Sequence, residues 1–317
     1  MRKNVFIAMA IWFLLALSLN AEAGNFVSGS TGADGPFNPP TQVPAGTTID
    51  GSTVTVPLSP NGIFNFTTVT IPSGTTVKFQ KNAANTPVYI LTTGDVNIAG
   101  TINISGENGI DGHSGQVGGI LGGKGGSGGG DGGYGGEPAG TGVAAKTPGV
   151  GLGPGGGSAF DTSGNLCYAA SGGSYASSGN VQSCHTSFHT CATTITYGNY
   201  SLLPLIGGSG GGGGVSGVSN GGSGGGGGGA ILVASSSSIN MIGTITANGG
   251  NGGNNPTASG EGGGGGGGSG GAIKLIANSI TGTGNLYARG GSGGTGGCPQ
   301  GWSGDCPRCG AIGGSGR

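Results

Sequence analysis

Charged residues, aromatic residues and long apolar runs are all scarce in this sequence. Asp, Glu, Lys and Arg make up only 7% of the 317 residues, which excludes a chain that is held open by charge repulsion. Aromatic residues make up 6%, too few for an ordinary globular core in a chain of this length. After residue 23 no stretch reaches the roughly 20 apolar residues of a membrane span, so we expect no transmembrane span in the mature chain.

Glycine, in contrast, accounts for 85 residues. There is no Gly-X-Y period and no proline enrichment, which excludes collagen. The glycines gather in runs, one of them within residues 107–157 and others directly before Ala230 and Ala272. Two interpretations are open: the runs are free linkers, or they pack as polyglycine-II strands, which lack a Cβ and approach one another closely. Because the runs recur at the same point of successive repeats, we predict packing for residues 207–214, 224–229 and 262–268.

A repeat organises the rest of the chain, most clearly between residues 262 and 294. A glycine run leads into two short segments of alternating apolar and polar residues, and a near copy lies upstream, with Gly243 and Gly284 in the same slot. A third copy spans residues 88–106. Alternation with a period of two predicts strands, and repeats that cannot bury their own apolar face must stack on their neighbours. We therefore predict an all-β, right-handed parallel β-helix, a solenoid, with polyglycine-II-like flanks and a disulfide-stapled insertion.

The matching slots of the three copies also predict one shared apolar core. Its expected members are Val96, Ile98, Ile102, Ile104, Ile239, Met241, Ile245, Ala247, Ile280, Leu286 and Ala288.

The N-terminus has the pattern of a signal peptide, predicted for residues 1–23. Arg2 and Lys3 precede an apolar segment, and Ala21-Glu22-Ala23 matches a cleavage site, with an uncleaved anchor helix as the alternative. Export predicts a secreted, extracellular or cell-surface location. Without residues 2, 3 and 22, the 10 basic and 11 acidic residues become 8 and 10, so we expect no nucleic-acid partner. Proline-rich residues 24–62 are expected to cap the first coil. Residues 63–317 are expected to form the glycine-rich β-helix domain, with an inserted lobe at 158–206.

Three passages resemble secreted, glycine-rich bacterial β-helix proteins of adhesin-like character. They are Asp34-Gly35-x-Phe37, residues 63–106, and the segment Leu202-Leu203-Pro204-Leu205-Ile206-Gly207-Gly208-Ser209-Gly210-Gly211 with the glycine-rich coils after it. The resemblance covers most of the mature chain and implies the fold and an extracellular location, but it carries no catalytic residues. Proteins of this kind usually continue past Gly-Gly-Ser-Gly-Arg into another strand, which leads us to expect a truncated or shortened C-terminus.

Six cysteines lie in two clusters of three. In an exported chain an even number of cysteines most often forms disulfides, and six cysteines allow 15 pairings. Each cluster is odd in number, so either a bridge joins the clusters or free thiols remain. The disulfide candidates are Cys167, Cys184, Cys191, Cys298, Cys306 and Cys309.

Two cysteine motifs have a second interpretation. Residues Cys184, His185, His189 and Cys191 include four zinc-ligand types, but their spacing is irregular for a structural zinc site. The segment 306–309 has the Cys-x-x-Cys redox spacing, but its glycine-rich surroundings offer no helix N-terminus to stabilise a thiolate. We therefore expect no metal site and no cofactor.

Acidic residues that could catalyse a reaction are few. Parallel β-helices also host polysaccharide lyases and hydrolases, which need clustered carboxylates or aligned basic residues. Asp95, Glu107, Asp111 and His113 are the only local concentration, and serine replaces Asp95 in the other repeats, so no acidic ladder is expected.

We accordingly predict a non-enzymatic structural or adhesive protein whose repeated surface contacts a surface polysaccharide or another extracellular polymer. A polysaccharide-degrading enzyme is one alternative. An ice-binding protein is another, because Thr-x-Thr strands can present a flat, regular face. Thr244 and Thr246 correspond to Thr101 and Asn103 in one copy and to Asn285 and Tyr287 in the other, so we expect no sustained threonine ladder.

Overall fold

A computed structural model describes residues 25–113, 120–138, 147–159, 170–180, 194–217, 219–255, 262–296 and 316. All regular structure in these residues is β-strand. The strands are β1 (Gly35–Phe37), β2 (Thr48–Asp50), β3 (Thr53–Pro57), β4 (Ile63–Ile71), β5 (Thr76–Gln80), β6 (Val88–Thr92), β7 (Val96–Ile98), β8 (Thr101–Asn103), β9 (Ala230–Met241), β10 (Thr244–Thr246), β11 (Ala272–Thr281) and β12 (Asn285–Tyr287).

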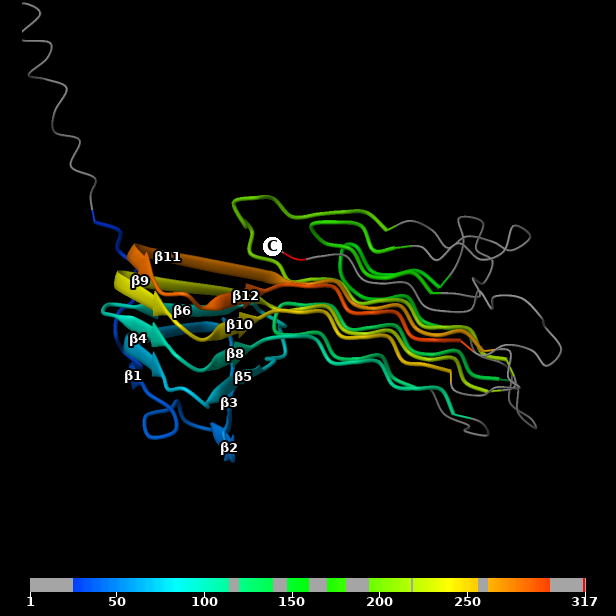
Figure 1. The fold of residues 1–317 in the computed structure, drawn as a ribbon, viewed down its shortest axis with the longest axis horizontal. Helices are drawn as coiled ribbons and strands as arrows, with labels where there is room; N and C mark the ends of the chain where they lie inside the picture. The colour runs from blue at the N-terminus through cyan, green and yellow to red at the C-terminus, as the bar shows by residue number, and fades with distance from the viewer. Residues whose placement is uncertain are drawn as a thin grey trace, which may run out of the picture.

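The strands form two six-stranded sheets at one end of the molecule (Figure 1). The first sheet has the order β1-β4-β6-β9-β11, with β7 pairing both β4 and β9. The second sheet has the order β12-β10-β8-β5-β3-β2. Every pairing is parallel except that of β2 with β3, which is antiparallel. The chain is therefore all-β with parallel sheets, as the alternating pattern predicts.

The register between strands follows the repeat in the sequence. Thr244 pairs with Thr101 and with Asn285, which places Gly100, Gly243 and Gly284 one above another at the corner before each strand. A Cβ on Gly243 would lie within 3.0 Å of backbone atoms of Ala99 and Gly100, so these corners accept only glycine without a shift. The slots assigned from sequence are correct.

The apolar core lies between the two sheets. The residues predicted for it in the two earlier copies, Val96 to Ile104 and Ile239 to Ala247 in alternation, are all buried. The prediction is wrong for Ile280 and Leu286, which are 50% and 48% exposed although they align with buried Ile239 and Ile245. Their strands β11 and β12 are the last of each sheet, so no further described strand covers them. Ala288 is partly buried and packs against the core.

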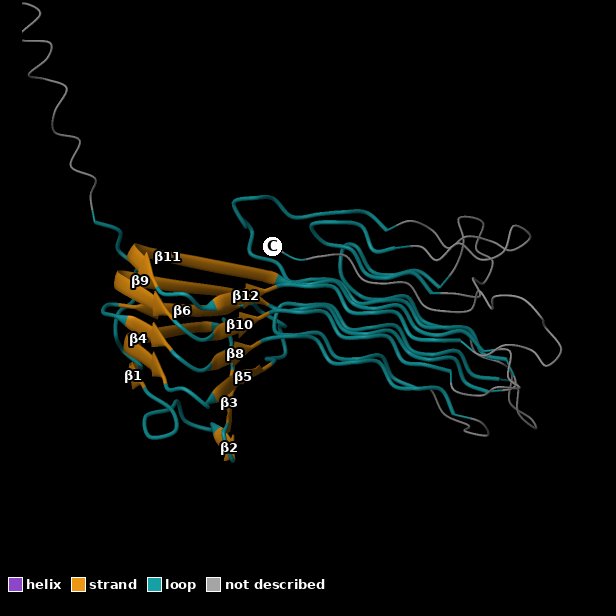
Figure 2. Cartoon of the chain, in the orientation of Figure 1, coloured by secondary structure: helices purple, strands orange, loops and turns teal. Residues whose placement is uncertain are grey.

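Long glycine-rich segments run side by side from the strands towards the other end of the molecule (Figures 1 and 2). We call these packed segments the glycine array. Residues 221–229 show its pattern: their N–H groups donate in turn to segments 130–136, 263–269 and 104–110. Their carbonyls accept from segments 123–126, 208–214 and 250–253. Each neighbour is met at every third residue, as in the bonds from Gly222, Gly225 and Gly228 to residues 263, 266 and 269.

Close approach of backbones explains why this array is built of glycine. A Cβ on Gly225 would lie within 3.0 Å of the backbone carbonyl group of Gly250, and one on Gly227 would do the same at Gly208. Backbone atoms cannot move aside as flexible side chains do. The array is therefore held by hydrogen bonds between backbone groups, about 1 kcal/mol each, and not by an apolar core.

Parts of the predicted lobe 158–206 join these structures. Gly173 donates to Gly267 and the carbonyl of Ser171 accepts from Gly212, which adds this segment to the glycine array. Tyr175 is fully buried and clusters with Leu202, Leu205, Ala230 and Ala272. The described part of the lobe thus packs on the outer side of the first sheet, at β9 and β11.

Candidate ligand-binding face

Outward side chains of the second sheet form two columns that run across five strands. In a parallel sheet, paired residues lie on the same side about 4.8 Å apart. The first column begins with Thr53, Thr76, Thr101 and Thr244 and ends at Asn285. The second column consists of Thr55, Lys78, Asn103, Thr246 and Tyr287.

The first column corrects the expectation that no threonine ladder is sustained. Four threonines stand in register, because β3 and β5 place Thr53 and Thr76 below Thr101. Thr53 and Thr76 lie outside the three copies of the repeat, so the repeat alone does not align them. Only the second column is interrupted, by Lys78 and Asn103.

The face continues from the strands onto the edge of the glycine array. Here a side chain of one glycine-rich segment accepts a hydrogen bond from a backbone N–H of the neighbouring segment. Asn251 N–H donates to Asn108 Oδ1, and Ser292 N–H donates to Asn251 Oδ1, both at 2.9 Å. The same relation joins Asp111, Asn254 and Thr295, one step further along the array.

At the edge of the array these side-chain oxygens accept hydrogen bonds from backbone N–H groups that do not bond to a backbone carbonyl. The side chains therefore have a structural role. Asparagine fits it because Oδ1 accepts while Nδ2 keeps two donors. Within the described residues, Nδ2 of Asn248, Asn251 and Asn254 makes no hydrogen bond. A row of donors is thus left facing solvent.

We call this surface the polar face and define it by three rows of five residues. The rows are Thr101, Asn103, Ser105, Asn108 and Asp111; Thr244, Thr246, Asn248, Asn251 and Asn254; and Asn285, Tyr287, Arg289, Ser292 and Thr295. Every member is at least partly exposed. In the last row, the Arg289 guanidinium lies 4.6 Å from the centre of the Tyr287 ring.

Sequence reasoning missed the array part of the polar face, although a signal was present. Asn248, Asn251 and Asn254 follow one another at intervals of three, and Arg289, Ser292 and Thr295 repeat that interval. Three residues is the period of an extended threefold helix, so side chains at this spacing point the same way. A period of two describes only the strands.

A groove of about 660 Å³ borders the first row of the polar face. Its polar lining comes from three stretches: Thr55, Lys78, Gln80 and Lys81 around β3 and β5, Asn103 to Asn108 after β8, and Lys124 in the glycine array. Phe79 and Ile104 add apolar surface. We call it the lysine groove, because three of its four charged residues are lysines and the fourth is Glu107.

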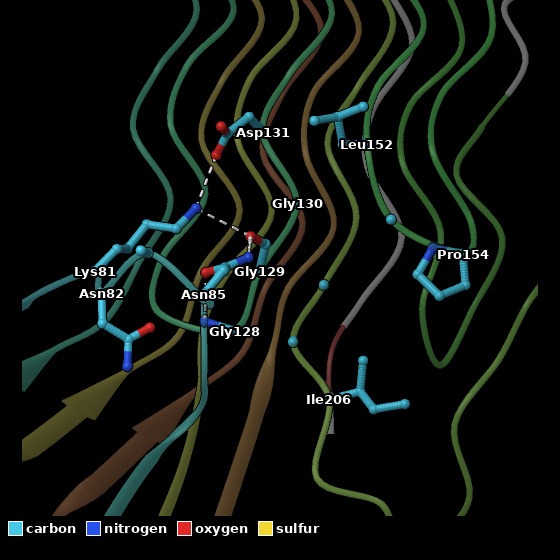
Figure 3. Close-up of a pocket in the computed structure, with 14 residues that line it drawn as sticks. Lys81, Asn82, Asn85, Gly128, Gly129, Gly130, Asp131, Leu152, Pro154 and Ile206 are labelled. Atoms are coloured by element: carbon cyan, nitrogen blue, oxygen red, sulfur yellow. Dashed lines mark hydrogen bonds and ion pairs between the residues drawn. The ribbon is translucent and has the colours of Figure 1, made fainter. Parts of the chain in front are cut away.

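A second cavity, of about 390 Å³, lies between the 81–85 loop and the glycine array (Figure 3). Lys81 Nζ donates to Asp131 Oδ1 at 2.9 Å and to the carbonyl of Gly129 at 3.2 Å, and Asn85 Nδ2 donates to that same carbonyl. Burial raises the pKa of Asp131, but hydrogen bonds from Lys81 and Gly125 and the nearby lysine charges outweigh it, so that the pKa is lowered. These groups satisfy one another, and they anchor the loop to the array.

Asp95 and Asp111, which were also singled out from sequence, both have structural partners. Hydrogen bonds from Ser237 and Ser238 lower the pKa of Asp95, which lies at a corner of the first sheet. Asp111 accepts from Asn254 N–H, and His113 Nδ1 contacts the Asp111 carbonyl. Among the described residues no three His, Cys, Asp or Glu side chains gather to hold a metal ion.

All six disulfide candidates (Cys167, Cys184, Cys191, Cys298, Cys306 and Cys309) lie outside the described residues, as do His185, His189 and the predicted signal peptide. Their pairing therefore stays a prediction. Within the part that is described, no helix is long and apolar enough to cross a membrane.

Comparison of this chain with protein-family models, with curated proteins and with solved structures found no match.

Proposed function

We propose that this chain is a secreted or cell-surface protein without catalytic activity, and that its polar face adheres to an extended extracellular polymer such as a surface polysaccharide. We also propose a more specific description of the fold. The two sheets are walls of a right-handed parallel β-helix, and the glycine array is a bundle of polyglycine-II strands, a type of helix with three residues per turn.

One observation carries the proposal: polar side chains recur in a fixed register over three rows, both on the strands of the second sheet and along the edge of the glycine array. A polymer repeats its own hydroxyl groups at a fixed interval. A rigid surface with repeated hydroxyl and amide groups can meet many of them at once, so that weak contacts add up along the chain. Since the array and the sheets fix this face before binding, little conformational entropy is lost on contact.

Retention on immobilised cellulose, chitin and polygalacturonate tests the proposal. Thr244 lies in the middle row, and its side chain makes no hydrogen bond within the described residues, so Thr244→Glu adds bulk and charge to the face without removing a contact. Thr70→Glu is the matched control, because Thr70 is exposed on β4, in the first sheet. We expect at least one polymer to retain the wild type and the control but not Thr244→Glu. No retention at all, or retention unchanged by Thr244→Glu, would refute polymer adhesion through this face.

The threonine column favours ice binding as a second candidate function. Four threonines in register at about 4.8 Å intervals form a flat strip of hydroxyl and methyl groups. Thermal hysteresis and ice-crystal shaping distinguish the two functions. An ice-binding protein shapes ice crystals and loses that activity in Thr244→Glu, whereas a polymer-binding protein leaves ice growth unchanged.

A further inference from the structure

We infer that the lysine groove binds an acidic sugar, a hexuronate residue within an extracellular polysaccharide. This inference rests on the proposed function and names the class of polymer. It is carried by two lysines that make no ion pair with the described residues and by the polar groups that line the same groove.

The charge of the groove is its first distinguishing property. Lys78 and Lys124 are both exposed, and neither Nζ makes an ion pair or hydrogen bond with the described residues. The third lysine, Lys81, is different, because its ammonium group is held by Asp131. Glu107 is the single acidic residue in the lining. The groove is therefore locally positive, although the chain as a whole has a net charge of −1.

The position of Lys78 strengthens this reading. It stands in a column whose flanking residues are Thr55 and Asn103, neither of which offers an anion. Lys124, which belongs to the glycine array, also lines the groove. Two ammonium groups from separate parts of the fold thus border one cavity, where a carboxylate can bind between them or to either one.

The remaining lining fits a sugar better than a peptide or a nucleic acid. Gln80, Asn103, Ser105 and Asn108 offer amide and hydroxyl groups, which both donate to and accept from sugar hydroxyls. Phe79 and Ile104 provide apolar surface for the C–H side of a ring. A nucleic-acid groove needs many phosphate contacts and exposed aromatic platforms. The lining has neither, since it holds three lysines, no arginine and a half-buried Phe79.

The groove also shares residues with the polar face. Asn103, Ser105 and Asn108 line the groove and form part of the first row. A polymer that places one acidic residue in the groove can therefore extend its following residues along the rows. This connection predicts that long chains bind more tightly than short ones through the added contacts.

Binding of oligogalacturonate to the full mature chain, measured by calorimetry, tests the inference. The methyl ester of the same oligomer removes the negative charge but keeps the hydroxyl groups, and polyglutamate keeps the charge without the sugar. We expect the acid form to bind and the ester to bind at least about tenfold more weakly, the loss expected for a charge-assisted hydrogen bond. Equal binding of the ester, or polyglutamate binding as tightly as the uronate, would overturn the inference.

Single variants locate the site. Lys78→Gln and Lys124→Gln should each weaken oligogalacturonate binding about tenfold. Lys274→Gln is the control, because Lys274 lies on β11 outside the groove and donates to the Ser201 carbonyl, yet its loss changes the net charge equally. Unchanged melting temperatures establish that each variant is folded. Binding that is insensitive to both groove variants would refute the site.

The failure of this inference and that of the proposed function give different results. If polygalacturonate binds and Thr244→Glu abolishes retention while the lysine variants bind normally, the polar face acts alone and the groove assignment is wrong. If the short oligomer binds through the lysines but the long polymer binds no tighter and Thr244→Glu has no effect, the groove assignment is supported and polymer adhesion along the face is wrong.

Discussion

Replacing Gly265 with alanine tests whether the glycine array is a packed structure. Gly265 N–H donates to the Gly253 carbonyl at 2.9 Å, and its own carbonyl accepts from Gly294 at 2.8 Å. A Cβ here would lie within 3.0 Å of the backbone carbonyl of Ser223, so one of the two segments must move. Overpacking costs about 1–3 kcal/mol, and weakening two hydrogen bonds costs about 1 kcal/mol each. Alanine also lowers the conformational entropy of the unfolded chain, but this stabilises the folded protein by only about 0.4–1 kcal/mol.

The net expectation is a loss of about 2–5 kcal/mol. At about 2.1 cal/mol/K of unfolding entropy per residue, this loss lowers the melting temperature by roughly 3–7 °C. Thermal unfolding followed by calorimetry measures this loss, and amide exchange of the array should be slow in the wild type. Gly74→Ala is the control: nothing lies within 4 Å of its Cβ, but its φ is 82°, so it reports backbone strain alone. A neutral or stabilising Gly265→Ala together with fast exchange in the array would refute the packing argument.

Three further outcomes are expected. Ile245→Ala should cost about 2–5 kcal/mol because its side chain is fully buried, and urea unfolding should show less than half that cost for Leu286→Ala, which is 48% exposed. Because the folded-state pKa of Asp131 is lowered, its contribution to stability is present above the ordinary carboxyl range and is lost as the pH falls below about 4. Stability curves against pH should therefore be flatter on the acid side for Asp131→Asn, and an unchanged acid slope would contradict the Lys81 contact. Thiol labelling of denatured, unreduced protein should leave Cys184 and Cys191 unmodified, whereas stoichiometric zinc release with both thiols labelled would refute their oxidation.

Much of the register could be predicted from sequence because glycine marks the same corner in each copy. Gly100, Gly243 and Gly284 fall in one line, and the alternation around them identifies the inward residues. Exposure was not predictable in the same way. Ile245 and Leu286 occupy equivalent slots, but β10 is paired on both sides, whereas β12 has no further strand next to it among the described residues. The repeat in the sequence predicts the position of a residue within its strand, whereas its burial depends on whether a neighbouring strand covers it.

The candidate site was less accessible to sequence reasoning. The lysine groove is lined by Lys78, Asn108 and Lys124, which come from β5, the segment after β8 and the glycine array, and no pattern in the sequence shows that these stretches lie next to one another. Asn251 belongs to the polar face through a period of three, whereas Thr246 belongs to it through a period of two. A search for a single period, of two or of three residues, finds only part of this surface.

The composition of the glycine array has a consequence for how the protein responds to cold. Exposing apolar surface on unfolding raises the heat capacity, whereas exposing polar backbone lowers it. In segments such as 221–229 the buried surface is mainly peptide group, so unfolding should change the heat capacity less, per residue, than the roughly 12–15 cal/mol/K of ordinary domains. A small heat-capacity change makes the curve of stability against temperature shallow. Such a scaffold keeps its shape near the freezing point of water, where proteins that depend on apolar cores lose part of their driving force.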